Sequence, residues 1–143
     1  MIEVVCGLIE NPSGEFLVCR RPIGRDLGGL WEFPGGKVED GEDHETAIIR
    51  ELREELAIEV GVVRAFSPII WAYPHLQIRL HPYHCKILTG EPQAIEHERL
   101  QWCAPADFKM LSWAPADVPI YEELLLWAET TSLKSHLAKT QVI

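Results

Sequence analysis

The stretch of sequence that decides the fold runs from Gly36 to Ile58 and reads GKVEDGEDHETAIIRELREELAI. Its first part contains glycines and several acidic residues, which is typical of a loop, here ending near Asp43. From His44 onward, apolar residues recur at the spacing of one buried helical stripe, formed by Ala47, Ile48, Leu52 and Leu56. The pattern therefore predicts an amphipathic helix that begins near His44.

Three carboxylates on this helix form an acidic ridge. Glu51, Glu54 and Glu55 are three and four positions apart, so they project from one helical face. Like charges at this spacing repel, which destabilises the helix by about a few tenths of a kcal/mol per pair if the ridge faces only water. A bridging divalent cation would make the ridge favourable, and oxygen ligands prefer magnesium or manganese to zinc. A solvated acidic face is the alternative interpretation of these three residues alone.

The whole stretch resembles the Nudix box, whose pattern is Gly-x5-Glu-x7-Arg-Glu-U-x-Glu-Glu-x-Gly-U, with U an aliphatic residue. The matching positions are Gly36, Glu42, Arg50, Glu51, Leu52, Glu54, Glu55 and Ile58. So many fixed positions at the required spacing make this a specific signal.

One position departs from the pattern, because Ala57 stands where the family has its second glycine. That glycine normally takes the left-handed conformation that ends the helix. Ala57 in the same conformation would cost about 1 kcal/mol. The departure concerns the helix exit and removes no metal ligand.

The preceding segment, from Trp31 to Glu39, resembles the MutT-type branch of the family, which hydrolyses nucleoside triphosphates. The resemblance implies an α/β fold, an α/β/α sandwich with a mixed β-sheet between helices. It also implies a magnesium site, in which manganese can substitute, with Arg50 and Glu42 holding the loop to the helix and Phe33 in the substrate site. The implied ligands are the Gly35 carbonyl and the carboxylates of Glu51, Glu54 and Glu55.

A further metal ligand in the MutT branch comes from a loop before a late strand. The matching stretch here runs from Glu96 to Trp102. By this resemblance Glu96 is the first choice and Glu98 the reserve, although either could be a surface carboxylate. We expect His97 to be structural or exposed.

The resemblance also implies two substrate contacts. Arg21 follows a predicted strand and takes the position of an arginine that binds substrate, while Arg20 should point to the opposite face. A surface ion pair is the alternative for Arg21. Asp117 takes the position of a base-contacting Asn or Asp, although a residue before a helical pattern can also serve as a helix N-cap.

The activity implied by the resemblance is hydrolysis of a nucleoside triphosphate to a nucleoside monophosphate and pyrophosphate, by attack at the β-phosphorus. Glu51 or Glu54 would act as general base, and Arg50 is counted with them among the catalytic residues. Around Asp117 the sequence is similar to the CTP pyrophosphohydrolase group, so cytosine nucleotides are expected first and 8-oxo-dGTP second.

Two rival functions remain at this point. The first is a Nudix hydrolase of another nucleoside diphosphate derivative, such as a dinucleoside polyphosphate, a nucleotide sugar or an RNA 5′ end. The second is a non-catalytic MutT-like recognition module. Modules of that kind typically lack the acidic ridge, which is complete here.

Length and composition bound the remaining properties. The chain has 143 residues, 47% of them hydrophobic and 24% charged, which predicts one ordered domain over residues 1–143 with a polar tail from about residue 130. The net charge of -9 argues against duplex nucleic acid as a partner, leaving a small-molecule nucleotide. We expect a cytoplasmic monomer or homodimer with no membrane segment, whose four cysteines are buried and reduced.

Turn residues and apolar runs predict the other elements. A hairpin is expected over residues 4–9 and 15–20, then a short strand over 30–33. A short helix should begin at Pro105, and a second amphipathic helix should cover residues 118–128. Further strands are expected over residues 58–63, 69–71, 76–88 and 100–103.

Overall fold

The computed structural model describes the backbone of residues 1–141 and the side chains of residues 1–131. Its strands form an eight-stranded sheet with the path β3-β2-β1-β7-β5, to which β4, β6 and β8 pair through β1, β7 and β2. Strands β1 and β7 are parallel neighbours, whereas the other pairs are antiparallel, so the sheet is mixed. The strands are β1 (Ile2–Glu10), β2 (Phe16–Arg20), β3 (Trp31–Glu32), β4 (Gly35–Lys37), β5 (Glu59–Ala65), β6 (Ile69–Tyr73), β7 (Leu76–Thr89) and β8 (Arg99–Cys103).

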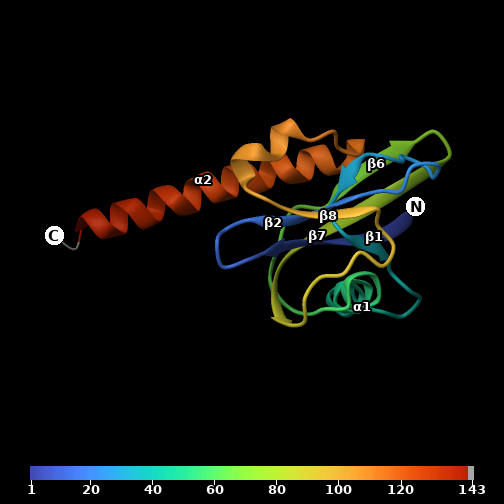
Figure 1. Cartoon of the computed structure of the whole chain (residues 1–143), viewed down its shortest axis with the longest axis horizontal. Coiled ribbons are helices and arrows are strands. Elements are labelled where there is room, and N and C mark those ends of the chain that lie inside the picture. Colours follow the sequence, from blue (N-terminus) through green and yellow to red (C-terminus); the bar gives the residue numbers. More distant parts are fainter. Residues whose placement is uncertain (142–143) are drawn as a thin grey trace.

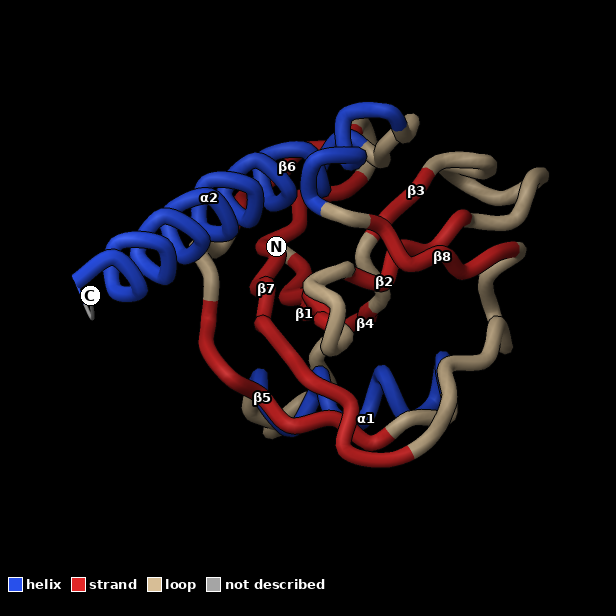
Figure 2. The backbone as a smooth tube through the Cα atoms, turned by 60° about the vertical axis from the view of Figure 1, so that its left-hand side comes forward, coloured by secondary structure: helices blue, strands red, loops and turns tan. Residues whose placement is uncertain are grey.

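Helices lie on both sides of the strands (Figures 1 and 2). Helix α1 (His44–Leu56) covers one side, and α2 (Val118–Gln141) covers the other together with the short 3-10 helices η1 (Pro105–Met110) and η2 (Pro115–Asp117). Each side has its own apolar core, one including Ile48 and Leu52 of α1, the other including Ile120 and Leu124 of α2. The expected α/β/α sandwich with a mixed sheet is therefore confirmed.

The ends of α1 are fixed by local contacts. The Asp43 side chain caps the first turn by accepting a hydrogen bond from the Thr46 backbone N–H at 2.8 Å. At the other end Ala57 adopts the left-handed conformation, with φ 57° and ψ 38°, and its N–H bonds to the Arg53 carbonyl. The chain therefore leaves the helix in the conformation expected of the family's glycine, and the strain at Ala57 costs about 1 kcal/mol.

Two predicted boundaries were wrong. Residues 34–43 were expected to be loop throughout, but Gly35–Lys37 pairs with β1 as strand β4, because a strand of three residues is too short to leave a periodic signal. Helix α2 was expected to end at residue 128, but it continues to Gln141. The predicted polar tail contains no glycine or proline that would stop it. Residues 142 and 143 of that tail lie outside the described residues.

The cysteine prediction is confirmed, since Cys6, Cys19, Cys85 and Cys103 are buried free thiols. Burial raises the pKa of each thiol above its ordinary value. Within the described residues, no helix combines the length and the apolar character needed to span a membrane.

Candidate active site

A cavity of about 400 Å³ lies between the α1 side of the molecule and the segment that leads into α2. Its walls come from strands β1, β3, β4, β6 and β7, from α1 and η2, and from the loops after β2 and before β8. The side chains that bear on chemistry are distributed around it: Arg21, Glu32, Phe33, Glu55, Glu96 and Asp117. The cavity therefore has an acidic end on α1 and a second end near η2.

At the acidic end, Glu55 is only 8% exposed, and its Oε2 atom has no hydrogen-bond partner among the described residues. Burial, and then the carboxylates of Glu51, Glu96 and Glu32, raises the pKa of Glu55 to about 9. Burial likewise raises the pKa of Glu51, although the hydrogen bond from Arg50 opposes this. A buried carboxylate with an unpaired oxygen, set among other carboxylates, gains stability when a cation binds beside it.

Two glycines make room for this cluster. A Cβ atom on Gly36 would overlap the Glu51 carboxylate, and one on Gly35 would overlap the Val5 carbonyl oxygen. Because β4 approaches both β1 and α1 so closely, only glycine fits at either position. Gly35, Gly36 and Glu55 line one side of the cavity, whereas Glu51 and Glu54 of the same helix are not among its lining residues.

Arg50 links the acidic ridge to the loop that precedes α1. Its guanidinium donates to Glu42 at 2.7 and 2.9 Å, to Glu51 at 3.0 Å, to Glu54 at 3.2 Å and to the Lys37 carbonyl at 3.1 Å. A planar fork with several donors suits this arrangement better than a lysine would. Glu54 is the most exposed of the three ridge carboxylates, with a 57% exposed side chain.

We expect Glu42→Gln to destabilise the protein at neutral pH and much less in acid. Hydrogen bonds from Arg50, then from the Glu39 backbone, lower the pKa of Glu42 from 4.5 to about 2. Folding thus favours the ionised form, so its contribution to the free energy of unfolding is complete above pH 4.5 and lost as the pH falls towards 2. Urea unfolding of both proteins from neutral to acidic pH should show their free energies converging.

The matched control is Glu39→Gln, since Glu39 lies 3.6 Å from Arg50 with a 67% exposed side chain. It should differ little from the wild type at any pH. A difference between wild type and Glu42→Gln that stays constant through the acid range would mean that Glu42 acts by packing alone.

The far end of the cavity is built around Asp117, which is 7% exposed. Its carboxylate accepts a hydrogen bond from the Phe33 backbone N–H at 2.7 Å. Burial, and then the charge of Glu32, raises the pKa of Asp117 well above its ordinary value. The contact ties η2 to the segment after β3, and within the described residues no hydrogen bond from the Asp117 side chain to α2 is found.

Aromatic residues support this end. Phe33 is 3% exposed and packs against Trp113, with ring centroids 5.0 Å apart, and against Phe108. The hydroxyl of Tyr73 accepts a hydrogen bond from the Ala116 backbone N–H at 3.3 Å. Phe33 and Tyr73 line the cavity at this end beside Asp117, so apolar groups surround a polar one there, as is typical of ligand pockets.

Arg20 and Arg21 diverge, as adjacent residues at a strand end should. Arg21 lines the cavity, donating to Glu32 at 3.1 Å and to the Asp26 carbonyl at 2.8 Å. Arg20 instead pairs with Glu98 at 2.9 Å. The two glutamates of the loop before β8 also differ in position: Glu96 lines the cavity, whereas Glu98 is not among its lining residues.

One cavity residue, Glu32, was missed from the sequence, and its neighbour His97 was expected to be structural or exposed. Glu32 lies between Arg21 and His97, and it was not singled out, although a charge between Trp31 and Phe33 in a short strand was a usable signal. The His97 side chain is 6% exposed and its Nε2 lies 3.0 Å from Glu32, a contact that fits the structural one of its two expected roles, and the residue also lines the cavity. The remaining motif residues, Leu52 and Ile58, are buried in the α1-side core.

Comparison with known proteins identifies the family. Residues 5–123 match the model of the NUDIX domain. The chain is 42% identical over 125 residues to a protein of Escherichia coli named CTP pyrophosphohydrolase, covering 87% of this chain and 92% of that one. It is 29% identical over 123 residues to an 8-oxo-dGTP diphosphatase of the same organism, covering 86% and 95%.

Among solved structures, the E. coli ORF135 protein superposes with a TM-score of 0.77 at 41% identity, covering 88% of this chain and 89% of the other. The chain therefore belongs to the Nudix family of hydrolases.

Proposed function

We propose that this protein hydrolyses a nucleoside triphosphate to a nucleoside monophosphate and pyrophosphate, with cytosine nucleotides as the first candidate substrates. The observation that carries the proposal is the arrangement of one cavity, with Glu96 and the buried Glu55, one of whose oxygens is unpaired, at one end and the buried carboxyl group of Asp117 beside Phe33 at the other. The first end suits a metal-bound polyphosphate, and the second suits a base.

Magnesium, or manganese in its place, would be held by the Gly35 carbonyl and by the carboxylates of Glu51, Glu54, Glu55 and Glu96. The unpartnered Oε2 atom of Glu55 and the mutual repulsion of the neighbouring carboxylates support this assignment. All these donors are oxygens, which hard divalent cations prefer. When bound, the metal neutralises phosphate charge in the transition state.

The chain itself supplies and orients the general base. We assign Glu51 or Glu54 to accept a proton from the attacking water, because Arg50 holds both carboxylates at hydrogen-bond distance. The water oxygen bonds to the β-phosphorus as the bond from that phosphorus to the oxygen that bridges it to the α-phosphorus breaks. The nucleoside monophosphate leaves with the bridging oxygen, and pyrophosphate keeps the oxygen from water.

Arg21 is assigned to the phosphates. It is a cation on the cavity wall of a protein with a net charge of -9, so it offers phosphate an attraction that the protein's overall field does not. Its contact with Glu32 would hold the guanidinium in place, and the pair is partly exposed. Removal of Arg21 should therefore weaken substrate binding rather than the fold.

Asp117 is assigned to the base. One of its oxygens is occupied by the Phe33 N–H, which leaves the other to meet a ligand. An accepting oxygen suits the exocyclic amine of cytosine, and the 42% identical relative is named for CTP. 8-oxo-dGTP is the second candidate, favoured by the raised pKa of Asp117, because a protonated carboxyl can donate to a purine carbonyl.

We predict that Asp117→Asn changes base selectivity and leaves metal dependence intact. If Asp117 accepts from an amine, the variant should lose preference for CTP and dCTP over dGTP by about 1–3 kcal/mol in kcat/KM. The measurement compares CTP, dCTP, 8-oxo-dGTP and dGTP in both proteins. A ranking headed by 8-oxo-dGTP would favour the second candidate, and an unchanged ranking would show that Asp117 only positions Phe33.

The same screen tests the rival substrates. Dinucleoside polyphosphates, nucleotide sugars and RNA 5′ ends share the metal chemistry and differ in the leaving group, so turnover of one of these in preference to all triphosphates would replace the proposal. Absence of turnover with every substrate would favour a non-catalytic recognition module. We further propose that the chain acts in the cytoplasm as a single domain over residues 1–143, as monomer or homodimer, on small nucleotides rather than duplex nucleic acid.

A further inference from the structure

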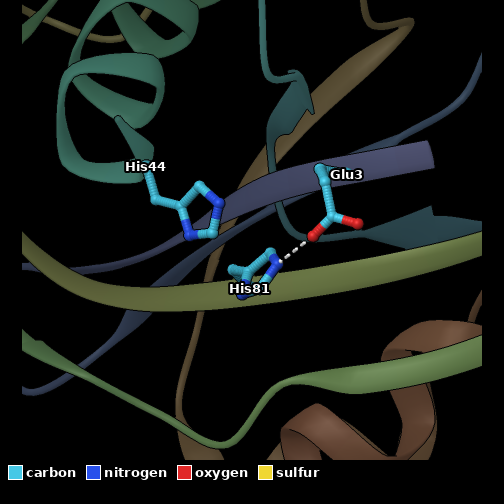
Figure 3. Close-up of side chains that lie close together, drawn as sticks. All are labelled: Glu3, His44 and His81. Atoms are coloured by element: carbon cyan, nitrogen blue, oxygen red, sulfur yellow. Dashed lines mark hydrogen bonds and ion pairs between the residues drawn. The ribbon is translucent and has the colours of Figure 1, made fainter. Parts of the chain in front are cut away.

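A second group of metal-ligating side chains lies where α1 begins over the sheet. Glu3 comes from β1, His81 from β7, and His44 is the first residue of α1. One ligand atom from each lies within 4.8 Å of the others (Figure 3). None of the three lines the active-site cavity.

The fold brings these residues together for a simple reason. Strands β1 and β7 are parallel, with Glu3 opposite Arg79 and Val5 opposite His81. Since alternate residues of a strand share a face, Glu3 and His81 lie on the face where Val5 packs into the α1-side core. The first turn of α1 then places the His44 ring next to His81, as Figure 3 shows.

The contacts within the group are close. His81 Nε2 lies 2.8 Å from Glu3 Oε1, and the rings of His44 and His81 have centroids 4.0 Å apart. Among the described side chains, neither ring nitrogen of His44 has a hydrogen-bond partner, so a lone pair is available. The group is also accessible, because the side chains of His81 and Glu3 are 12% and 33% exposed.

We propose that Glu3, His44 and His81 form a second metal site, which takes a divalent transition metal of the zinc type. Two imidazole nitrogens and one carboxylate oxygen are a ligand set that zinc uses, with solvent in the fourth position. Magnesium disfavours imidazole, so the two sites differ in the ion they select. The ion would replace the proton shared by His81 and Glu3, which widens that N to O distance from 2.8 Å to about 3.3 Å in a tetrahedral site.

Such an ion would join three elements that the sequence keeps far apart. It would fasten the first residue of the helix that carries the acidic ridge to the two parallel strands at the centre of the sheet. Its effect is therefore on the stability of the fold, by preferential binding to the folded state. Arg79 is the competing cation, since its guanidinium lies 3.5 Å from the Glu3 carboxylate.

The test uses the full chain without an affinity tag, stripped of metal and then held in excess magnesium so that the acidic ridge is occupied. Zinc is titrated calorimetrically, and cobalt is used as a spectroscopic substitute. We expect one zinc per chain, a rise in Tm with zinc, and tetrahedral cobalt bands without a thiolate charge-transfer band, because all four cysteines are buried. His44→Ala and Glu3→Gln should each lower zinc affinity at least about 10-fold.

Two further variants sharpen the result. His75→Ala is the matched control, because His75 is exposed in the turn between β6 and β7, and it should bind zinc as the wild type does. Arg79→Gln should bind zinc more tightly, since it removes the competing charge. Circular dichroism and the metal-free Tm establish that each variant folds.

Equal zinc affinity in wild type, His44→Ala and Glu3→Gln would overturn the proposal. Displacement of zinc by magnesium would also overturn it, since that result would place the zinc on the acidic ridge. Magnesium-dependent hydrolysis should be unchanged in His44→Ala, so failure of this site and failure of the proposed hydrolase function are separate outcomes.

Discussion

Glu55→Gln is expected to lower turnover by at least about 10²-fold while the protein remains folded. Glu55 is buried at the acidic end of the cavity with one oxygen unpartnered, so its ionised form depends on a cation for its stability. Glutamine keeps the shape of the side chain and removes the charge that would hold the metal against the phosphates. Glu54→Gln should cause a loss of the same order, and its exposed position makes a folding defect unexpected.

Turnover at saturating magnesium is the measurement, with thermal unfolding as the check on the fold. Glu45→Gln is the matched control, because Glu45 is exposed in the first turn of the same helix and does not line the cavity. Wild-type rates in both Glu54→Gln and Glu55→Gln would rule out the acidic ridge as the metal site.

Removal of divalent metal should abolish hydrolysis. A chelator in excess is expected to reduce the rate to that of the uncatalysed reaction, and millimolar magnesium or manganese should restore it. The reason lies in the charge of the site, since the carboxylates around the cavity would repel a triphosphate in the absence of a cation. Calcium should inhibit, because it favours more ligands and a looser geometry.

Activity should also weaken below neutral pH, because the ligands and the general base act as carboxylates. Rates in magnesium, manganese and calcium, each measured over a range of pH, test both expectations. Full activity in excess chelator would contradict a metal mechanism. Pyrophosphate release in a coupled assay, measured with zinc-free buffers, keeps this result independent of the second site.

The parts of the fold that could be predicted are those with a strong local signal. The stripe of Ile48, Leu52 and Leu56 predicted α1, and the turn at Asn11 to Gly14 predicted the hairpin of β1 and β2. Both signals involve residues close in sequence, which periodicity and turn chemistry detect. The spacing of the acidic ridge predicted one face of α1, and the structure brings Glu55 from that face and Glu96 from a distant loop to the same cavity.

The remaining features depend on contacts that no local pattern contains. Strand β4 exists because Gly35 meets Cys6 across the sheet, and a three-residue strand has no period of its own. The His97 side chain lies against the cavity because its ring nitrogen bonds to Glu32, which is 65 positions away. The triad of Glu3, His44 and His81 likewise depends on strand register, since Glu3 and His81 are 78 positions apart.

The two ends of the cavity differ in the length of chain that each must bring together. Arg50 reaches Glu42 over 8 positions and Lys37 over 13, whereas Asp117 reaches Phe33 over 84. Short loops close at a lower entropic cost, so most of the acidic end, the proposed phosphate site, can assemble as a unit of one loop and one helix, to which the distant loop adds Glu96. The base end is contributed by separate segments that touch that unit at few points. Substitutions there can therefore change which nucleotide is selected during evolution while the hydrolytic apparatus is inherited intact.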